Sequence, residues 1–503
     1  MLIDSPSLTS HASTARDRRT PHAAHVAYAQ SCRRAIALVA AMSIANAAQL
    51  GAQSGRAGAL PPRRQVAIVH ATIYTMSDST PIRDGIVVIG GGRITHVGPL
   101  ASVEIPADAR VIDASGKFVI PGLWDMHVHT AVPGGEPLLG LYLANGVTGV
   151  RDMGGDLGVI QDWRKQIRVG KLAGPRIVAS GPYLQGGEAA LPHFVVLTPA
   201  DARRAVDSLA KLGADFVKVH ELVPRDAYFE LARAARARGL ALAGHISAGI
   251  SVEEAADSGQ RSLEHLNGFA NPCTLSDSTR LAKVHSLHRL VMGECSTTDQ
   301  TPVYRHIAST RTWVTPTLIA LEMAAVLPGP VPADSLARYE PEFLREAMAA
   351  ALEIPADMPP DANVLGGALY SKRMETVRGL VRSGVPILAG TDAPLPNSIP
   401  GFGLHAELEA LVRSGLSPWQ ALRAATIEPA RYFASDTMGA ICAGCAADLV
   451  VLDADPLRDI RNTRRIALVV ADGRLYTPAA RAALRQKALR AARPAPARNK
   501  ASR

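Results

Sequence analysis

A regular alternation of short apolar strands with amphipathic helices, running from residue 121 to residue 435, constrains the fold of this chain most. One of the helical stretches is 224–238, where Leu231, Ala234 and Ala235 share one face. Eight strands that alternate with helices predict a parallel (β/α)8 barrel, an α/β fold. The apolar strands end near His129, Arg151, Ser180, His220, His245, His265, Pro316 and Asp392.

Short β-type segments flank the predicted barrel on both sides. Their period-two alternation and Gly/Asp turns predict that residues 63–120 and 436–478 pair into one small discontinuous β-sandwich domain. The barrel then takes residues 121–435. The interval between Pro316 and Pro386 is too long for one strand–helix unit. We interpret about 320–385 as a cap insertion, with a surface excursion that has no function as the alternative.

The N-terminal region has the pattern of a leader. In residues 31–52, Arg33 and Arg34 precede an apolar run that ends in a small-residue cleavage pattern, which favours a secretory signal peptide. Residues 1–62 are thus predicted to be a disordered leader with a linker, and the protein to be periplasmic or secreted. A buried alanine-rich helix is the alternative and would make the protein cytoplasmic. No later run of ~20 apolar residues predicts a membrane span in the mature protein.

The net charge of +9 is concentrated at the two ends of the chain. Residues 479–503 carry eight Lys and Arg and no acid, which predicts a disordered basic tail. Because the region between the ends is close to neutral, we expect a small-molecule substrate and no nucleic acid. The oligomeric state stays open, a homo-oligomer included.

Cys442 and Cys445 form a C-x-x-C motif without a second pair at zinc-ribbon spacing. We interpret them as two small residues of a turn. A disulfide between them is the alternative for an exported protein. No metal is expected there.

The chemistry is predicted at the carboxyl ends of the barrel strands, where barrel active sites lie. His127 and His129 are two residues apart in a strand and can grip one first-row metal ion together. Lys218 lies in an apolar strand, where an ammonium is costly to bury. It either reaches solvent at the strand end or has become a carbamate by adding carbon dioxide, an anion able to bridge two metals. The predicted metal site consists of His127, His129, Lys218, His245, His265 and Asp392.

In its motifs the chain resembles the amidohydrolase superfamily, from about residue 65 to 478. Lys218 on the fourth strand is similar to the branch of prolidase-like and N-acyl-amino-acid hydrolases. The resemblance implies two divalent ions, with zinc expected, and an N6-carboxylysine at Lys218 that bridges them. By the same resemblance, His127, His129 and Asp392 bind one ion, and His245 and His265 the other. The motifs are residues 121–129, 150–155, 216–219 and 390–393 and the two strand-end histidines.

The resemblance further implies cleavage of an amide C–N bond in a dipeptide or N-acyl amino acid by a hydroxide that bridges the metals. Asp392 would transfer the proton, and His265 is counted with it among the catalytic residues. His193, on the third strand–helix loop, is a candidate for orienting the scissile carbonyl. His220 stands where prolidase-like relatives tend to have a Tyr that holds the substrate carboxylate, so it is predicted to bind substrate without specifying a peptidase. Arg151 and Asp152 are interpreted as a buried pair that braces the site.

Two alternatives belong to other function classes. A deaminase or cyclic amide/imine hydrolase of the imidazolonepropionase type would use one metal ion. Such sites usually lack the bridging Lys, and many place a Glu three residues after the fifth-strand His, where this chain has Ala248. A non-enzymatic binding protein on the same fold would typically lose ligands, and this chain keeps all six.

Overall fold

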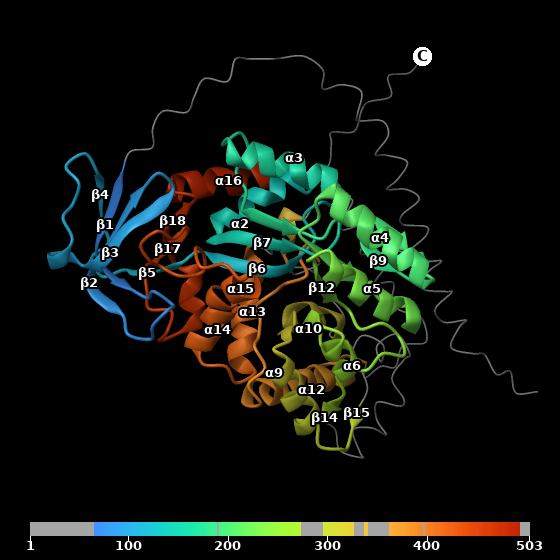
Figure 1. Ribbon diagram of the computed structural model, residues 1–503. Coiled ribbons are helices and arrows are strands. Elements are labelled where there is room, and N and C mark those ends of the chain that lie inside the picture. Colours follow the sequence, from blue (N-terminus) through green and yellow to red (C-terminus); the bar gives the residue numbers. More distant parts are fainter. Residues whose placement is uncertain are drawn as a thin grey trace, which may run out of the picture.

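The protein consists of a barrel and a sheet domain that lie side by side (Figure 1). The computed structural model describes residues 65–188, 191–272, 295–325, 336–340, 362–395 and 398–492. In Figure 1 the strands from the start of the chain pack beside strands from its end, at one side of the barrel. The two regions are therefore distinct in space although the sheet domain is discontinuous in sequence.

Parallel strands with buried side chains form the barrel wall. Hydrogen bonding runs β6–β7–β8 in one sheet and β11–β12–β13–β16 in another, and the Asp215 amide donates to the Ala179 carbonyl between them (2.9 Å). A segment around residues 386–393 joins β16 back to β6, because Ile387 pairs with Val314 and Ala393 with Val128. The predicted eight-strand order is confirmed. The named strands are β6 (Leu123–Val128), β7 (Val147–Asp152), β8 (Arg176–Ala179), β11 (Phe216–Val219), β12 (Ala241–Gly244), β13 (Gln260–Glu264) and β16 (Trp313–Thr315).

The helices around the barrel form where the sequence gives one apolar face and clear end signals. In α4 (Pro199–Leu212), Thr198 and Asp201 make a capping box, and Gly213 ends the helix at a φ of 78°. Its buried Ala202 and Leu209 lie seven residues apart on the face toward the wall. The other helices are α2 (Leu139–Ala144), α3 (Leu157–Arg168), α5 (Arg225–Ala237), α6 (Val252–Asp257), α9 (Thr301–Thr310), α10 (Leu318–Ala325), α12 (Ala362–Arg382), α13 (Phe402–Arg413), α14 (Pro418–Ala424) and α15 (Ile427–Tyr432).

Two short strands extend the wall beside β11, outside the eight-strand order. They are β9 (Tyr183–Gln185) and β10 (His193–Val195), which pair in parallel. Another short parallel pair, β14 (Asn271–Pro272) with β15 (Cys295–Ser296), lies near α12. Short 3-10 turns complete the described structure: η1 (Leu100–Ser102), η2 (Glu136–Leu138), η3 (Leu336–Tyr339) and η4 (Ile460–Arg464).

The sheet domain joins the two ends of the chain, as predicted. Ile120 of β5 pairs with Val450 of β17, so a strand before the barrel lies against one that follows it. Hydrogen bonding is continuous through all eight strands, in contrast to the two separate sheets of a sandwich, because β5 also pairs with β1. The strands are β1 (Val66–Ile73), β2 (Ile82–Gly90), β3 (Arg93–Pro99), β4 (Arg110–Asp113), β5 (Phe118–Pro121), β17 (Leu449–Leu452), β18 (Ile466–Ala471) and β19 (Arg474–Tyr476).

The basic C-terminal segment differs from its prediction as a disordered tail over 479–503. Helix α16 (Pro478–Ala491) follows the sheet domain and packs against α2. Arg481 is buried and donates to the carbonyls of Ala144 and Ile466, and Arg485 also donates to Ala144 (3.1 Å). Alanine favours helix, and the cations satisfy carbonyls at the end of α2, so like charge does not unfold this segment. Residues 493–503 lie outside the described structure.

The predicted cap over 320–385 is wrong for its last part, where the structure describes α12 (Ala362–Arg382). Val377 and Leu380 of α12 are fully buried in the main core, so this helix belongs to the barrel and leads into the eighth wall segment. Of the remaining span, the structure describes α10 up to residue 325 and η3. The predicted signal peptide at 31–52 also lies outside the described residues. Among the described residues, no helix has both the length and the apolar character needed to cross a membrane.

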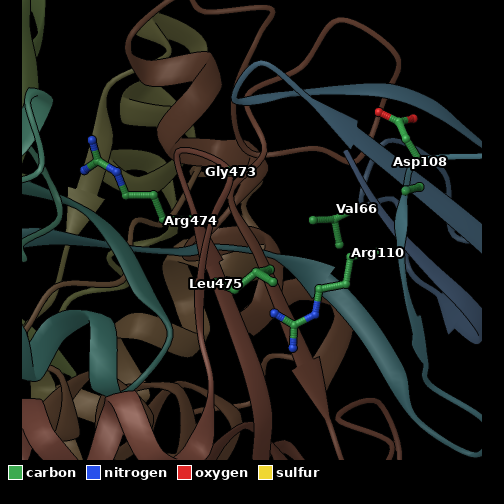
Figure 2. Close-up of a pocket in the computed structure, with 7 residues that line it drawn as sticks. Val66, Asp108, Arg110, Gly473, Arg474 and Leu475 are labelled. Atoms are coloured by element: carbon green, nitrogen blue, oxygen red, sulfur yellow. The ribbon is translucent and has the colours of Figure 1, made fainter. Parts of the chain in front are cut away.

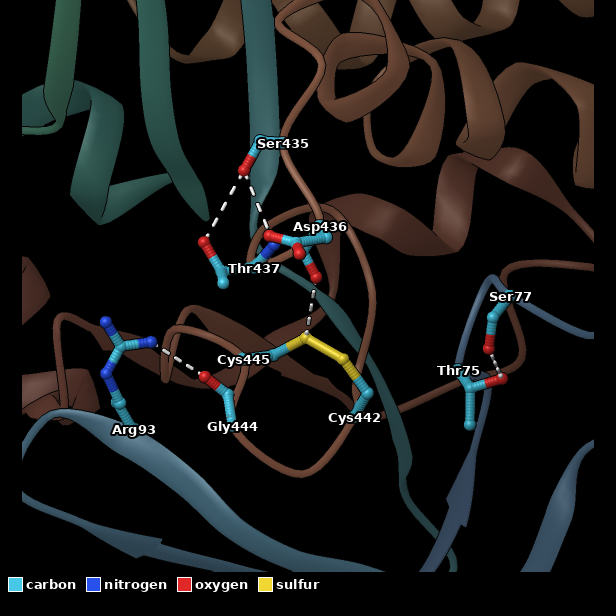
Figure 3. The surroundings of a disulfide bond; sticks show 9 residues. All are labelled: Thr75, Ser77, Arg93, Ser435, Asp436, Thr437, Cys442, Gly444 and Cys445. Carbon is cyan, nitrogen blue, oxygen red and sulfur yellow. Dashed lines mark hydrogen bonds between the residues drawn. A yellow bond between two sulfur atoms is a disulfide. The ribbon is translucent and has the colours of Figure 1, made fainter.

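Cys442 and Cys445 form a disulfide, which is the alternative that the sequence left open (Figure 3). The Cys445 amide donates to the Cys442 carbonyl (3.0 Å), which closes the turn between them. Gly444 and Ile94 then join this turn to β3, because the Gly444 amide donates to the Ile94 carbonyl (2.8 Å). The bond therefore lies in the sheet domain.

A pocket of about 520 Å³ also lies in the sheet domain (Figure 2). It contains no residue of the predicted site, and the guanidinium of Arg474 donates to the carbonyls of Ile167 and Arg168 (2.8 Å and 2.9 Å). It is lined by Val66, Asp108, Ala109, Arg110, Gly473, Arg474 and Leu475.

Candidate metal centre

Three predicted ligands meet where β6 ends and the eighth wall segment turns. His127 Nε2 and His129 Nε2 lie 3.3 Å and 3.2 Å from Asp392 Oδ1. The possible ligand atoms of the three residues all lie within 4.8 Å of one another. Two imidazole nitrogens and a carboxylate oxygen are a donor set that suits zinc and similar ions.

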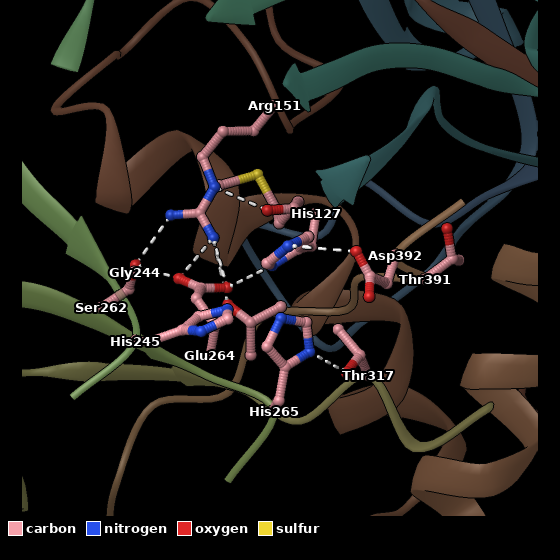
Figure 4. Close-up of polar contacts among 12 residues, drawn as sticks. His127, Arg151, Gly244, His245, Ser262, Glu264, His265, Thr317, Thr391 and Asp392 are labelled. Carbon is pink, nitrogen blue, oxygen red and sulfur yellow. Dashed lines mark hydrogen bonds and ion pairs between the residues drawn. The ribbon is translucent and has the colours of Figure 1, made fainter. Parts of the chain in front are cut away.

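The other three predicted ligands lie beside this group. The His265 ring centroid is 4.4 Å from that of His127 and 4.9 Å from that of His245. Lys218 is 1% exposed on β11, next to the strand that ends at His245. All six residues thus occupy one end of the barrel, and Figure 4 shows His127, His245, His265 and Asp392 gathered there.

Hydrogen bonding leaves specific ring nitrogens free for a metal. His127 Nδ1, His129 Nδ1 and His265 Nδ1 are bonded to Glu264 Oε2 (2.8 Å), the Gly154 carbonyl (3.0 Å) and Thr317 Oγ1 (2.7 Å). In contrast, His127 Nε2 and His245 Nδ1 are buried without a hydrogen-bond partner. The Nδ1 of His245 has only a 3.4 Å ion-pair contact with Glu221. Unpartnered buried nitrogens cost about 1–3 kcal/mol each, so the residues present fit bound divalent ions.

Burial sets the protonation of the site. Desolvation lowers the pKa of His127 and His245 well below the ordinary range, so the imidazoles are neutral, the form that binds metals. Burial also lowers the pKa of Lys218 to about 8. A larger fraction of its amine is then unprotonated at neutral pH, and only that form adds carbon dioxide. For Asp392, burial alone would raise the pKa, but His265, His129 and Lys218 hold it well below its usual range.

The backbone is strained at two of the six residues. His265 and Asp392 have φ values of 60° and 57°, in the left-handed region that costs a non-glycine residue about 1–3 kcal/mol. At Asp392 the strain is held by Asp125, which accepts hydrogen bonds from the Thr391 amide (3.0 Å) and hydroxyl (2.7 Å). Gly390 permits the close approach of the eighth segment, since a Cβ there would lie 2.9 Å from the His127 amide nitrogen.

The prediction that Arg151 pairs with Asp152 is wrong, because each residue has another partner. Arg151 donates to both oxygens of Glu264 (2.9 Å each), whereas Asp152 accepts from the amide and hydroxyl of Thr130 (2.6 Å each). Arg151 and Asp152 are adjacent in β7, and adjacent strand residues point to opposite faces. That alternation could have excluded the pair from sequence, and it places Glu264 and Ser262 together on the inner face.

The two predicted substrate-binding histidines lie on one side of the centre. The ring centroids of His220 and His245 are 4.1 Å apart. The ring centroid of Tyr183 lies 4.8 Å from that of His220 and 6.0 Å from that of His193. His193 is half-buried and bonds the Leu191 carbonyl through Nδ1 (3.0 Å). Sequence reasoning missed Tyr183 and Glu264. For Glu264, its position directly before a strand-end histidine was the available signal.

The comparisons place this chain in a family. The family model described as "Amidohydrolase family" matches residues 118–476, which is more than half of the chain. The protein therefore belongs to the amidohydrolase family, a class of hydrolases, as the motifs predicted.

Individual relatives differ in how much of the chain they cover. An ochratoxinase of Aspergillus niger is 24% identical over 79% of this chain and 83% of its own length. An imidazolonepropionase of Methylobacterium nodulans is 35% identical, but over 13% of this chain and only 17% of its own length. A crystal structure of a Xaa-Pro dipeptidase covers 82% of this chain and all of its own, at 22% identity and a TM-score of 0.61. At that identity the dipeptidase shows the fold alone.

Proposed function

We propose that this protein is a two-metal amidohydrolase that cleaves the C–N bond of a dipeptide or N-acyl amino acid. The observation that carries the proposal is the burial of Lys218, which is 1% exposed on β11, beside histidines whose pKa values burial lowers below the ordinary range. An ammonium in that position would repel metal ions, whereas a carbamate would bind them. A modified Lys218 therefore explains both the burial and the ligand set.

His127, His129 and Asp392 would hold one ion, His245 and His265 the second, and carboxylated Lys218 both, with zinc the expected metal. When bound, such ions polarise a carbonyl and lower the pKa of water towards ~7, which makes a nucleophile available at neutral pH.

The chain's own residues then handle protons and substrate. Asp392, an anion 3.2 Å from His129 Nε2, accepts a proton from the attacking water and returns it to the leaving amine. His220 has a buried, unpartnered Nδ1, and at neutral pH its ring can offer a hydrogen bond to the substrate. His193, whose ring centroid is 6.0 Å from that of Tyr183, would orient the scissile carbonyl.

A deaminase or cyclic amide/imine hydrolase of the imidazolonepropionase type is the second candidate, and the local match to such an enzyme favours it. That match covers only a short stretch of either chain. At the position that would carry a proton-shuttling Glu, Ala248 is exposed and cannot move a proton. The number of metal ions per chain separates the two candidates.

The decisive experiment is a metal count combined with a substrate library. The purified protein, loaded with Zn²⁺ in bicarbonate, is tested against dipeptides and N-acyl amino acids, and its metal content is measured. We expect about two ions per chain, a carbamate on Lys218 by mass spectrometry or crystallography, and loss of hydrolysis after chelation. One ion with an unmodified lysine would reject the two-metal proposal, and full activity after metal removal would reject metal-dependent hydrolysis altogether.

We also propose export of the protein through residues 31–52. The Cys442–Cys445 disulfide is of a kind that persists in oxidising compartments. N-terminal sequencing of the mature protein should find the start near residue 48. A cytoplasmic protein with residues 31–52 intact would contradict export.

A further inference from the structure

Beneath the metal centre lies a fully buried ion pair that the proposed reaction does not use. The side chains of Arg151 and Glu264 are both 0% exposed, and Nη2 of Arg151 donates to both carboxylate oxygens of Glu264 at 2.9 Å. Figure 4 shows the guanidinium above Glu264, with His127 beside the same carboxylate. Removing two such charges from water is costly, so the pair needs a compensating role or complete hydrogen bonding.

The hydrogen bonding around the pair is nearly complete. Arg151 also donates to the Met126 carbonyl (2.6 Å), the Ser262 hydroxyl (2.8 Å) and the Thr315 hydroxyl (3.2 Å). Its guanidinium carbon lies 4.9 Å from the centre of the Tyr432 ring. The bonds come from four strands of the wall, β6, β7, β13 and β16, so the carboxylate of Glu264 is fixed in position and orientation.

The remaining contact of Glu264 points to the metal centre. Its Oε1 accepts from Ser262 (2.6 Å) as well as from Arg151, and its Oε2 lies 2.8 Å from His127 Nδ1. A carboxylate paired with an arginine accepts hydrogen bonds and donates none, so the proton of the neutral His127 ring must be on Nδ1. The lone pair is then on Nε2, which is buried, unpartnered and 3.3 Å from Asp392 Oδ1.

We propose that Arg151 and Glu264 are positioning residues that fix the tautomer and ring orientation of His127 for metal binding. The inference rests on the proposed metal centre but not on the identity of the substrate. The Gly154 carbonyl favours the same tautomer in His129, whereas the Thr317 hydroxyl beside His265 Nδ1 can accept or donate a hydrogen bond. Of these three histidines, only His127 has a carboxylate as the hydrogen-bond acceptor of its Nδ1, and the charge of that carboxylate is balanced by Arg151. Such partners typically change metal affinity 10–100-fold.

The test replaces the ion pair without leaving an unpaired charge. In the double variant Arg151→Met/Glu264→Leu both charges are lost, and apolar replacement of a buried pair is often neutral for folding. Zn²⁺ affinity is measured by competition with a chelating dye, and the unfolding midpoint is measured beside it. We expect a 10–100-fold loss of affinity for the ion bound by His127 at a near-normal midpoint. The matched control is Arg423→Met/Glu428→Leu, a partly buried pair in the α14–α15 region, which should leave affinity within twofold.

Glu264→Gln provides the second measurement. Glutamine keeps the shape and an acceptor oxygen but can also turn its NH₂ toward His127, so His127 should populate both tautomers. Nitrogen-15 NMR of labelled histidine in the metal-free protein should show the Nδ1–H form in the unmodified chain and a mixture in the variant.

The outcomes separate the inference from the proposed function. If the unmodified protein binds two Zn²⁺ and the double variant binds them equally tightly, the positioning role is overturned and the proposed function stands. If affinity falls as expected but no amide is cleaved, the positioning role stands and the substrate proposal fails. A chain that binds no Zn²⁺ overturns both.

Discussion

The strand ends of the barrel and the strands of the sheet domain are built by opposite rules. In β17, Leu449, Val450, Val451 and Leu452 are all apolar, buried and paired on both sides. At the barrel's carboxyl end, the buried side chains are histidines, a lysine and carboxylates, and some ring nitrogens have no partner. Apolar burial and complete strand pairing stabilise the first region. The second is retained against local cost, which is typical of a site built to bind something.

The contrast is clearest when backbone strain is included. Asp392 adopts a left-handed conformation and is held there by Asp125, whose own pKa burial raises to about 7. A fold that only needed stability would put other residues in both places. Substitutions at the barrel's carboxyl end should therefore alter metal binding and kcat more than the free energy of unfolding. Substitutions in the sheet domain should alter the free energy of unfolding more than metal binding and kcat.

The largest expected effect tests the chemical side of the contrast. Asp392→Asn should retain most of the bound metal but lower kcat by ~10²–10⁴-fold, because an amide cannot accept the proton. Steady-state kinetics with metal analysis checks this. The control is Asp156→Asn at the start of α3, where asparagine caps as well as aspartate and activity should be unchanged. An active Asp392→Asn enzyme would contradict the assigned proton transfer.

Lys218→Met should have the next largest effect. Methionine fits the apolar strand, so the fold should persist, but the bridge between the ions is lost. We expect the metal content to fall from about two ions toward one and the rate to fall ~10²–10³-fold, since a bound ion contributes several kcal/mol to the transition state. Lys171→Met, at an exposed position, is the control. Two tightly held ions in Lys218→Met would show that no carbamate is required.

Ile68→Ala probes the other region. The side chain is fully buried in the core of the sheet domain, so its removal should cost about 2–5 kcal/mol of unfolding free energy. Val111→Ala, which is 53% exposed on β4, should cost little. For both variants we expect unchanged metal content and kcat at temperatures where they are folded. A changed kcat in Ile68→Ala would break the contrast between the two regions.

A smaller effect is expected on the free energy of unfolding when the pH is lowered, because of His405, which lies where the two regions meet. His405 is buried between Thr463 and the Asn145 carbonyl, and burial lowers its pKa to about 3. Since the unfolded chain takes up a proton near pH 6.5 and the folded chain does not, stability falls as pH drops from 6.5 toward 3. At pH 5 the loss is about 2 kcal/mol. Urea unfolding at pH 7.5 and 5 should show a smaller decrease for His405→Gln, and equal decreases would exclude His405 as the source.

The sequence predicted the barrel, its strand ends and the gathering of six candidate ligands at one end of it, because period and residue type act locally. Seven of the eight predicted strand ends lie one residue from the observed ends, and the eighth, near Asp392, falls in a segment that pairs through isolated bridges. The partner of Arg151 was not predictable by proximity in sequence, because Glu264 lies 113 residues away and only the closed barrel brings it close. The basic tail was also misjudged, because composition favoured disorder, whereas the carbonyl acceptors of Arg481 lie at the end of α2 and in β18 and come together only in the folded chain.

The β5–β17 pairing has a consequence for biosynthesis. Strand β5 leaves the ribosome some 330 residues before β17 does. At ~5–20 residues synthesised per second, the edge of β5 that pairs with β17 stays unpaired for roughly 15–65 s. During that time the nascent chain carries the unpaired apolar edge of Phe118–Pro121, a surface that other chains could pair with. The barrel between them must be translated before that edge is covered. The sheet domain is thus completed late in synthesis, and in a chain truncated before residue 449 this edge of β5 would stay unpaired.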